Sequence, residues 1–546
     1  MFLFLSNKKR NLFLVTEFSN QVNWGQSIMQ EEIQLMLSAR FPLLWVVSPE
    51  EETAEETLCA AASAKKAQIY FWDFARGWND SGAGKGNPMQ GLERVSKAAG
   101  HNSAIFVMKD IATLISPGAN GQIASNQLPI VREIKNLARD IARDRRTLVI
   151  LSDQLRLPVE LREETTVVDF SLPSIEEISE LVDRLVPAEK IRLTDEEKEQ
   201  LIKACQGLSR CRIARVLAKC LAASVVVTKV AINSVIEEKR QTIRETGILE
   251  FIPAVAGLET VGGLENLKAW VKVRSHSFSD KAREYGLPSP KGLLLAGIQG
   301  TGKSLSAKTI AAEWKLPLLR LDVGRLFGGI VGESESRVRQ VIKLAEAIAP
   351  CVLWIDEADK AFGNINNGGD GDSGTSRRVF GSLITWMQEK TAPVFIVMTA
   401  NNVEILPAEL LRKGRLDELF FIHLPSTTER KEIWKVHLEK VRPDRCGNKR
   451  SDFDLGMLAA TSKDFSGAEI EQVIYEAMQQ GFSREEDFTQ ADVLSAIHHC
   501  IPLAQIAQPQ IEALKSWAVR SGAKSASFQY SEIYQPELRM LEVDNN

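Results

Sequence analysis

Several features that define common classes of protein are missing from this chain. Its seven cysteines are odd in number and none is arranged as C-x-x-C, which favours a reduced chain over a disulfide or zinc framework. The six histidines include no H-E-x-x-H sequence, which excludes that metalloprotease motif. No apolar run reaches the roughly 18 residues of a membrane span, because even the run at 221–232 is interrupted by Lys229. We therefore expect no membrane span.

An excess of charge of either sign is also missing. The chain has 67 basic and 71 acidic residues and a formal net charge of −4. Proteins that bind nucleic acid broadly are usually basic, so stable nucleic-acid binding is not expected. Hydrophobic residues at 44% and charged residues at 25% describe an ordinary globular protein. A length of 546 residues predicts about three to four domains.

The most informative feature that is present is a Gly-rich run between an apolar segment at 292–296 and an Ala-rich segment at 305–314. It fits G-x-x-x-x-G-K-S/T, a phosphate-binding loop that requires a strand before it and a helix after it. Backbone N–H groups in such a loop point at phosphate oxygens beside a helix N-terminus. We expect Lys303 to reach the β/γ-phosphates and Ser304 to hold Mg²⁺. The predicted ATP-binding residues are Gly297, Ile298, Gln299, Gly300, Thr301, Gly302, Lys303 and Ser304.

A pair of carboxylates follows further along the chain. The apolar run 351–355 reads as a buried strand that ends in Asp356 and Glu357. Phosphoryl transfer needs a carboxylate beside the metal and a group that orients the attacking water. Asp356 suits the first role, as a second Mg²⁺-holding residue beside Ser304, and Glu357 suits the second role as a catalytic residue.

Strand and helix signals alternate from Gly292 to Leu424, which predicts an α/β fold with a parallel sheet and helices on both faces. Phosphate then lies at the carboxyl ends of the strands. The expected strands are 292–296, 317–322, 351–355, 394–399 and 419–424. After Pro425 the signals become helical, which predicts a small helical lid with helices near 428–441, 455–460, 466–480 and 490–504.

The N-terminal half resembles an altered copy of the C-terminal half. Apolar segments at 43–48, 105–110 and 147–151 match the strands at 293–297, 351–357 and 394–398 in the same order and at a nearly constant offset. A duplication explains this better than an unrelated α/β domain, which is the alternative. The sequence Pro49-Glu50-Glu51-Glu52 stands in place of the phosphate-binding loop. We expect these acids to repel a nucleotide, so that this half is a degenerate copy without a nucleotide site.

These patterns predict a division of the chain. The apolar start Met1–Leu5 precedes rather than follows a basic cluster, the reverse of a signal peptide, and opens an N-terminal extension. The predicted parts are the extension at 1–28, a degenerate α/β domain at 29–172, a helical segment and linker at 173–250, an ATPase domain at 251–425, its helical lid at 426–510 and a C-terminal tail at 511–546.

With both nucleotide motifs placed, residues from about 257 to 480 resemble the AAA ATPases, in the branch that includes the FtsH-type proteins. Val261 and Gly262 are similar to the family's adenine-contacting segment, and Asn401 to its first sensor. Ala468 lies in a stretch that resembles the second sensor. The resemblance implies that Arg412 and Arg415 are arginine fingers acting on a neighbouring subunit's ATP; an intrachain salt bridge is the alternative.

The resemblance further implies a Mg²⁺-dependent ATPase that works as a ring, a homo-oligomer and specifically a hexamer, and that remodels or regulates a protein partner. In the pore loop, where many members carry an aromatic residue, this chain has Ile330. The alternative is therefore a nucleotide-switched scaffold that hydrolyses ATP slowly and threads no polypeptide.

An inactive AAA-like half ahead of one active module is similar to a narrower group, the hypothetical chloroplast reading frame forty-six ATPases of cyanobacteria and plastids. This resemblance covers about residues 29–510. It implies a location in the cyanobacterial cytoplasm or plastid stroma and a link to photosynthesis.

Overall fold

The computed structural model describes residues 28–98, 103–117, 123–142, 144–253, 257–327, 333–363, 373–407, 409–412, 414–446 and 452–528. The chain divides into two compact units, Met1–Thr242 and Ile243–Asn546, and each is described by itself. Within the described ranges, no helix combines the length and the apolar character that a membrane span requires.

The first unit contains a sheet with the order β3-β2-β4-β5-β1-β6. All neighbours pair in parallel except β2 and β3. The strands are β1 (Leu43–Val47), β2 (Gln68–Asp73), β3 (Gly77–Trp78), β4 (Ala104–Lys109), β5 (Arg146–Ser152) and β6 (Thr165–Asp169). Apolar residues fill both faces of the sheet, as expected for parallel strands between two layers of helices.

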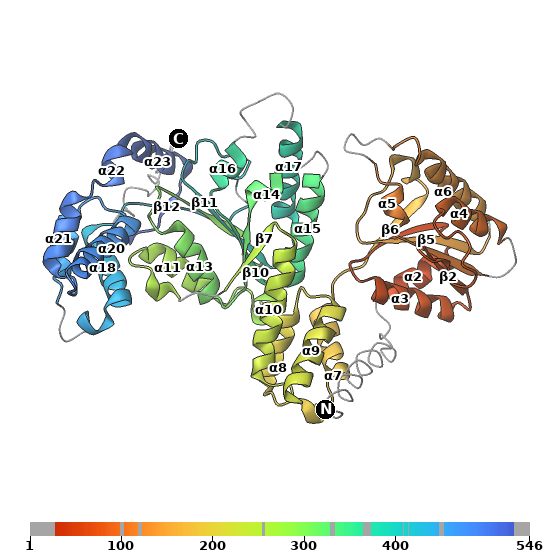
Figure 1. Cartoon of the computed structure of the whole chain (residues 1–546). Helices are drawn as coiled ribbons and strands as arrows, with labels where there is room; N and C mark the ends of the chain where they lie inside the picture. The colour runs from red at the N-terminus through yellow and green to blue at the C-terminus, as the bar shows by residue number, and fades with distance from the viewer. Residues whose placement is uncertain are drawn as a thin grey trace, which may run out of the picture. The chain divides into compact units, whose positions relative to one another are not determined.

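Helices cover both faces of this sheet (Figure 1). One face packs against α2 (Ile28–Ser38) and α3 (Glu51–Ala64). The other packs against α4 (Pro88–Lys97), α5 (Ile111–Leu114) and α6 (Leu128–Ile141). A helical segment with its own apolar core follows: α7 (Ile175–Leu185), α8 (Asp195–Cys205), α9 (Arg210–Ser224) and α10 (Lys229–Glu245).

The second unit contains a sheet with the order β13-β12-β8-β11-β10-β9-β7. Its strands are β7 (Leu249–Ile252), β8 (Gly292–Gly297), β9 (Leu318–Leu321), β10 (Cys351–Ile355), β11 (Val394–Ala400), β12 (Glu418–Ile422) and β13 (Lys524–Ser525). All pair in parallel except the edge strand β7. The five central strands lie where the sequence predicts them. The edge strands β7 and β13 were not predicted, because runs this short show no clear periodicity.

Two layers of helices enclose this second sheet (Figure 1). One face packs against α11 (Glu265–Val273) and α13 (Lys303–Glu313). The other packs against α15 (Glu333–Ile348), α17 (Ser373–Glu389) and α23 (Gln508–Ser521). The shorter helices are α12 (Asp280–Glu284), α14 (Val323–Phe327), α16 (Ala358–Gly363) and α22 (Leu503–Ile506). The lid is built from α18 (Thr427–Val441), α19 (Leu455–Thr461), α20 (Gly467–Ser483) and α21 (Gln490–His499) around a core of its own.

The two units share one strand order. In the first unit β2-β4-β5-β1-β6 run side by side, and in the second unit β9-β10-β11-β8-β12 run in the same sequence of positions. In each of these five-strand sets the first strand along the chain, β1 or β8, lies beside the last, β6 or β12, and the other three strands lie on its other side. The structure therefore confirms the predicted fold class: a P-loop α/β module with a helical lid, preceded by an α/β half of the same design that has no phosphate-binding loop.

The C-terminal region differs from the tail that the sequence predicts at 511–546. Helix α23 buries Ile511, Leu514 and Trp517 in the core of the second unit, and β13 extends the sheet beyond β12. Residues 511–525 are thus part of the folded second unit, and residues 529–546 lie outside the described residues. The sequence analysis assigned these residues to a tail because they lie beyond the segment that resembles the AAA family.

Candidate nucleotide site

The phosphate-binding loop connects the carboxyl end of β8 to the N-terminus of α13. Gly300 and Gly302 have φ angles of +83° and +90°, a backbone conformation that favours glycine. A Cβ at Gly300 would also lie 2.8 Å from Ser466 Oγ of the lid. The loop and the lid therefore approach each other too closely for any side chain at this position.

Lys303 is the first residue of α13 and is only 6% exposed. Its ammonium donates hydrogen bonds to the carbonyls of Gly297, at 2.8 Å, and Ile298. Burial lowers the pKa of Lys303 to about 8, against the opposing effect of nearby Asp359, Asp356 and Glu357. The loop thus surrounds the buried ammonium of Lys303. Its positive charge can stabilise a polyanion bound in the loop.

The carboxylates after β10 are joined to the strand beside it. Asp356 Oδ1 accepts hydrogen bonds from Ser304 Oγ at 3.2 Å and from Thr399 Oγ1 at 2.6 Å. The Glu357 N–H donates to Thr399 Oγ1 at 3.0 Å, and Glu357 has a left-handed φ of 50°. Its side chain pairs with exposed Lys360 at 2.7 Å, a surface contact that contributes little. Thr399 therefore holds both acids in position, a role that the sequence analysis missed.

We expect Thr399→Val to lower the rate of ATP hydrolysis by about 10- to 100-fold with little change in ATP affinity, because it releases a strained Glu357 backbone. Thr399→Ser keeps the hydroxyl and is expected to retain most of the activity. Steady-state turnover and calorimetric ATP binding measured on both variants check this. A valine variant that turns over like the serine variant would show that the hydroxyl does not position Glu357.

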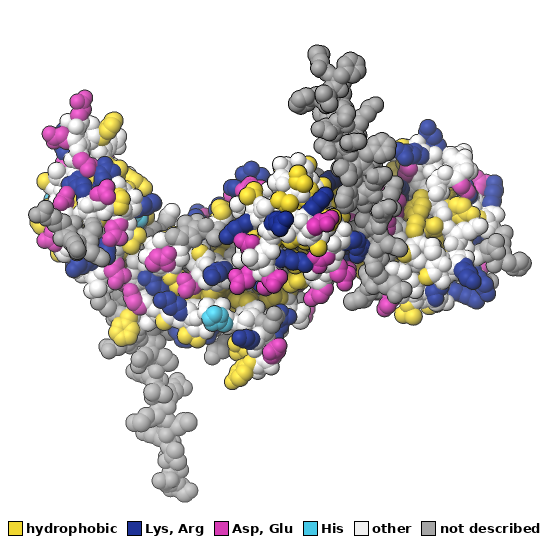
Figure 2. Space-filling view, turned by 90° about the horizontal axis from the view of Figure 1, so that it is seen from below, with side chains coloured by type: hydrophobic (Ala, Val, Ile, Leu, Met, Phe, Trp, Pro, Cys, Tyr) yellow, Lys and Arg dark blue, Asp and Glu magenta, His cyan; other side chains and the backbone are white. Residues whose placement is uncertain are grey.

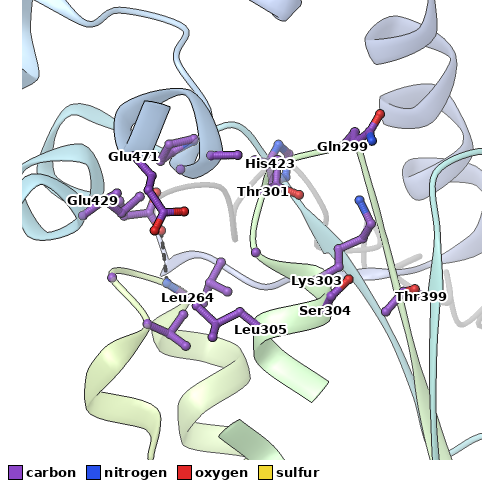
Figure 3. A pocket seen from close by; sticks show the side chains of 18 of the residues that line it. Leu264, Gln299, Thr301, Lys303, Ser304, Leu305, Thr399, His423, Glu429 and Glu471 are labelled. Atoms are coloured by element: carbon purple, nitrogen blue, oxygen red, sulfur yellow. Dashed lines mark hydrogen bonds between the residues drawn. The ribbon is translucent and has the colours of Figure 1, made fainter. Parts of the chain in front are cut away.

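A pocket of about 350 Å³ lies between the phosphate-binding loop and the lid. It brings together most of the residues that the sequence predicts for the site: Val261, Gly262, Gln299, Gly300, Thr301, Gly302, Lys303, Ser304, Asp356, Glu357, Asn401 and Ala468. Gly297 and Ile298 do not line it and instead support Lys303 through their carbonyls. Figure 3 shows Lys303, Ser304 and Thr399 near one another, and Glu429 and Glu471 projecting from the lid.

The wall formed by residues 260–264 is tied to lid helix α18. Glu432 Oε2 accepts from the Gly263 N–H at 2.8 Å. Glu429 Oε1 accepts from the Leu264 N–H at 3.3 Å, the contact dashed in Figure 3. On the other side, the Ala468 N–H at the start of α20 donates to the Gly300 carbonyl at 3.1 Å. The lid thus contacts both the wall and the loop, and residues of all three line the pocket.

The side chains beside Lys303 suit a hard divalent cation. Ser304 and Asp356 supply a hydroxyl and a carboxylate that lie 3.2 Å apart, and Mg²⁺ prefers such oxygen ligands together with water and phosphate oxygens. Among the described residues there is no cluster of three or more His, Cys, Asp or Glu that could hold a metal ion.

The predicted arginine fingers lie elsewhere. Arg412 and Arg415 are described and follow β11, but neither lines the pocket. Arg412 is exposed, and the Arg415 guanidinium donates to the Glu409 carbonyl. The pore-loop position Ile330 lies outside the described residues. These two arginines are thus separate from the nucleotide pocket of their own chain.

The corresponding place in the first unit is filled by the chain's own side chains. Glu50, which follows β1, is buried and pairs with Arg210 at 2.7 Å, and Arg210 also pairs with Glu177 at 2.8 Å. Lys109, at the end of β4, pairs with Glu51 at 2.9 Å. We predicted that these glutamates exclude a nucleotide by charge repulsion alone. The structure shows in addition that some of them are paired with cations. At least two of the three glutamates pair with cations, and one of these cations, Arg210, is the first residue of α9.

We expect Arg210→Met to destabilise the first unit by about 3–5 kcal/mol, because it leaves the buried Glu50 carboxylate without its partner. Hydrogen exchange on the full chain reports on each unit through its own peptides. The loss of stability of the first unit is measured in peptides from residues 43–170. As a matched control, Arg212→Met removes a half-exposed pair with Glu238 at 3.5 Å and is expected to cost about 1 kcal/mol or less. Equal effects of the two variants would contradict a special role for the Glu50–Arg210 pair.

Comparisons with known proteins agree with this geometry. The family model of the "ATPase family associated with various cellular activities (AAA)" matches residues 293–424. Two models of SpoVK-like AAA ATPases, for the N-terminal and second domains, match residues 29–170 and 176–246. The AAA domain-containing protein ycf46 of Guillardia theta is 45% identical over 504 residues, which cover 91% of this chain and 96% of that protein. The chain belongs to the ycf46 family of AAA ATPases.

Other members of the ycf46 family are similarly close. The ycf46 protein of Trieres chinensis is 45% identical over 502 residues, 91% of this chain and 98% of that protein. The one from Pyropia yezoensis is 43% identical over 502 residues, 91% of this chain and 99% of that protein. The predicted AAA resemblance and its narrower form are thereby confirmed. As a ycf46-family AAA ATPase, the chain binds nucleotide and hydrolyses ATP.

Proposed function

We propose that this ycf46-family protein hydrolyses the β–γ bond of ATP, with Mg²⁺, in the pocket between the phosphate-binding loop and the lid. The observation that carries the proposal is the convergence of Lys303, Ser304, Asp356, Glu357 and Asn401 on that single pocket. Catalysis of this kind is mostly positioning and charge stabilisation, which this set of side chains can supply.

Each residue has a distinct proposed role. Lys303 neutralises the β/γ-phosphates, while Ser304 and Asp356 hold Mg²⁺ through their oxygens. Glu357 accepts a proton from the attacking water or orients it, and Asn401 lies near the γ-phosphate. Val261, Gly262 and Ala468 line the same pocket and are proposed to contact the adenine. The bound Mg²⁺ offsets the charge that develops on the phosphates.

The active form is proposed to be a ring, specifically a hexamer. Arg412 is exposed, and neither Arg412 nor Arg415 lines the pocket of its own chain, which supports their use at a neighbour's nucleotide. The ring is proposed to remodel or regulate a protein partner in a plastid stroma or cyanobacterial cytoplasm, with a link to photosynthesis. Nucleic acid is not proposed as a partner. Figure 2 shows basic and acidic side chains interspersed on the face that it presents.

The test is native mass measured with and without ATP, together with the turnover rate. A remodelling ATPase is expected to assemble with Mg·ATP and to hydrolyse at about 1 s⁻¹ or faster. Assembly with turnover slower by orders of magnitude would favour the nucleotide-switched scaffold. Turnover by a species that stays monomeric at every protein concentration would contradict the ring.

A further inference from the structure

The segment Ser525–Ser527, close to the last described residue, reaches the nucleotide pocket. Lys524 and Ser525 form β13 in parallel register with Phe420 and Phe421 of β12. The Ala526 N–H then donates to the Phe421 carbonyl at 2.9 Å. Ser527, only 2% exposed, is one of the residues that line the pocket. The chain therefore leaves the lid, packs α23 against the sheet and places Ser527 beside the pocket.

The same segment caps the helix that follows the pocket wall. Helix α11 has Leu264 at its N-cap, with a left-handed φ of 62° and no side-chain cap. Its first N–H groups need acceptors. The Ala526 carbonyl supplies one, because it accepts from the N–H groups of Asn266 at 3.0 Å and Leu267 at 3.2 Å. A carbonyl from near the C-terminus thus replaces the usual local cap.

The Asn266 side chain fastens this contact. Its amide Nδ2 lies 3.1 Å from the Ser525 carbonyl and 3.2 Å from the Ser527 carbonyl. Ser525 Oγ donates to the Ser527 carbonyl at 2.7 Å and accepts from the Ser527 N–H at 3.2 Å. The three residues therefore form a compact, buried turn with few ways to shift.

We propose that Ser525–Ser527 is part of the nucleotide site and fixes the wall on which the nucleobase lies. The wall at 260–264 is held by lid helix α18 on one side and, through the start of α11, by this C-terminal segment on the other. Because both sides of the wall are fixed in advance, less conformational entropy is lost when a ligand binds against it. The inference rests on the proposed function, since it assumes that the pocket is the ATP site. Asn266 is a positioning residue that acts through this segment.

Because the wall lies at the nucleoside end of the pocket, loss of the segment should affect ligands that carry a base and spare ligands that have none. The wall contacts the nucleoside end of ATP, whereas Lys303 and the loop contact the phosphates. Loss of the segment is therefore expected to weaken ATP while leaving inorganic tripolyphosphate, which has no base, bound as before. A purely structural role would weaken both ligands together.

The experiment measures Mg·ATP and Mg·tripolyphosphate binding by calorimetry on the full chain and its variants. Ending the chain after Ala523, or Asn266→Ala, is expected to lower ATP affinity by about tenfold, since each removes hydrogen bonds worth about 1 kcal/mol. Tripolyphosphate affinity is expected to stay within about twofold of the wild type. If the shortened chain does not fold, the Asn266→Ala variant carries the test.

Two controls complete the design. Lys524→Ala lies beside the segment, but its exposed side chain only pairs with Glu418, and ATP affinity is expected to be unchanged. Ending the chain after Phe528 keeps the segment and should bind ATP like the wild type. Unchanged ATP affinity in the Asn266→Ala variant, or equal losses for both ligands, would overturn the inference. Failure of the wild-type chain to bind ATP would instead overturn the proposed function.

Discussion

Arg415→Ala is expected to lower the rate of ATP hydrolysis by about 10³-fold or more while ATP affinity stays close to that of the wild type. A guanidinium supplied from a neighbouring subunit can contribute about 10³–10⁵ in rate by stabilising charge in the transition state, which corresponds to about 4–7 kcal/mol. Arg415 does not line its own pocket, so its removal leaves the ground-state contacts of ATP intact. Arg412→Ala is expected to behave in the same way.

Mixing two inactive variants tests this role directly. In a ring that contains Arg415→Ala and Lys303→Ala subunits, some interfaces pair an intact arginine with an intact phosphate-binding loop, and activity should return there. As a matched control, Arg520→Ala removes an exposed arginine that pairs loosely with Glu404 at 3.8 Å and should leave turnover unchanged. A mixture that demonstrably co-assembles yet stays as inactive as either variant would contradict action across the interface.

Glu357→Gln is expected to retain ATP but to lose hydrolysis by about 10²- to 10⁴-fold, because the amide keeps the shape of the side chain and lacks its basicity. Binding should persist, since Lys303 and the loop hold the phosphates. Single-turnover hydrolysis and calorimetric ATP binding measure the two effects separately. Glu404→Gln, an exposed glutamate beyond Asn401, is the control. Hydrolysis within about threefold of the wild type would assign the water-orienting role to another group.

The phosphate-binding loop and the acids after β10 could be predicted from the sequence because each is a local pattern. A strand, a glycine loop and a helix follow one another within 292–314, and the run 351–357 joins a strand to its two carboxylates. The parallel sheet then places both at the same edge. The likeness of the first unit to the second was predictable in the same way, from apolar runs that recur in the same order along the chain.

The contacts between distant parts of the chain could not be predicted. Glu50 and Arg210 are 160 residues apart, and nothing near Glu50 in the sequence indicates that a buried arginine will neutralise it. Ser527 and Asn266 are 261 residues apart, and β13 is too short to show a period. The hydroxyl of Thr399 reaches Asp356 only because β10 and β11 are paired in register. Such contacts are set by the fold, so they require a structure.

The most direct test of the account is the number of ATP molecules that bind per chain, measured by calorimetry on the full-length wild type and on Lys303→Ala. The account predicts one site per wild-type chain and none in Lys303→Ala, because the ammonium of Lys303 is the cation at the centre of the loop and the first unit has filled its own site with Glu50 and Arg210. Lys308→Ala, on the same helix α13 but outside the pocket, should bind like the wild type. Two sites per wild-type chain, or undiminished binding by Lys303→Ala, would contradict the account.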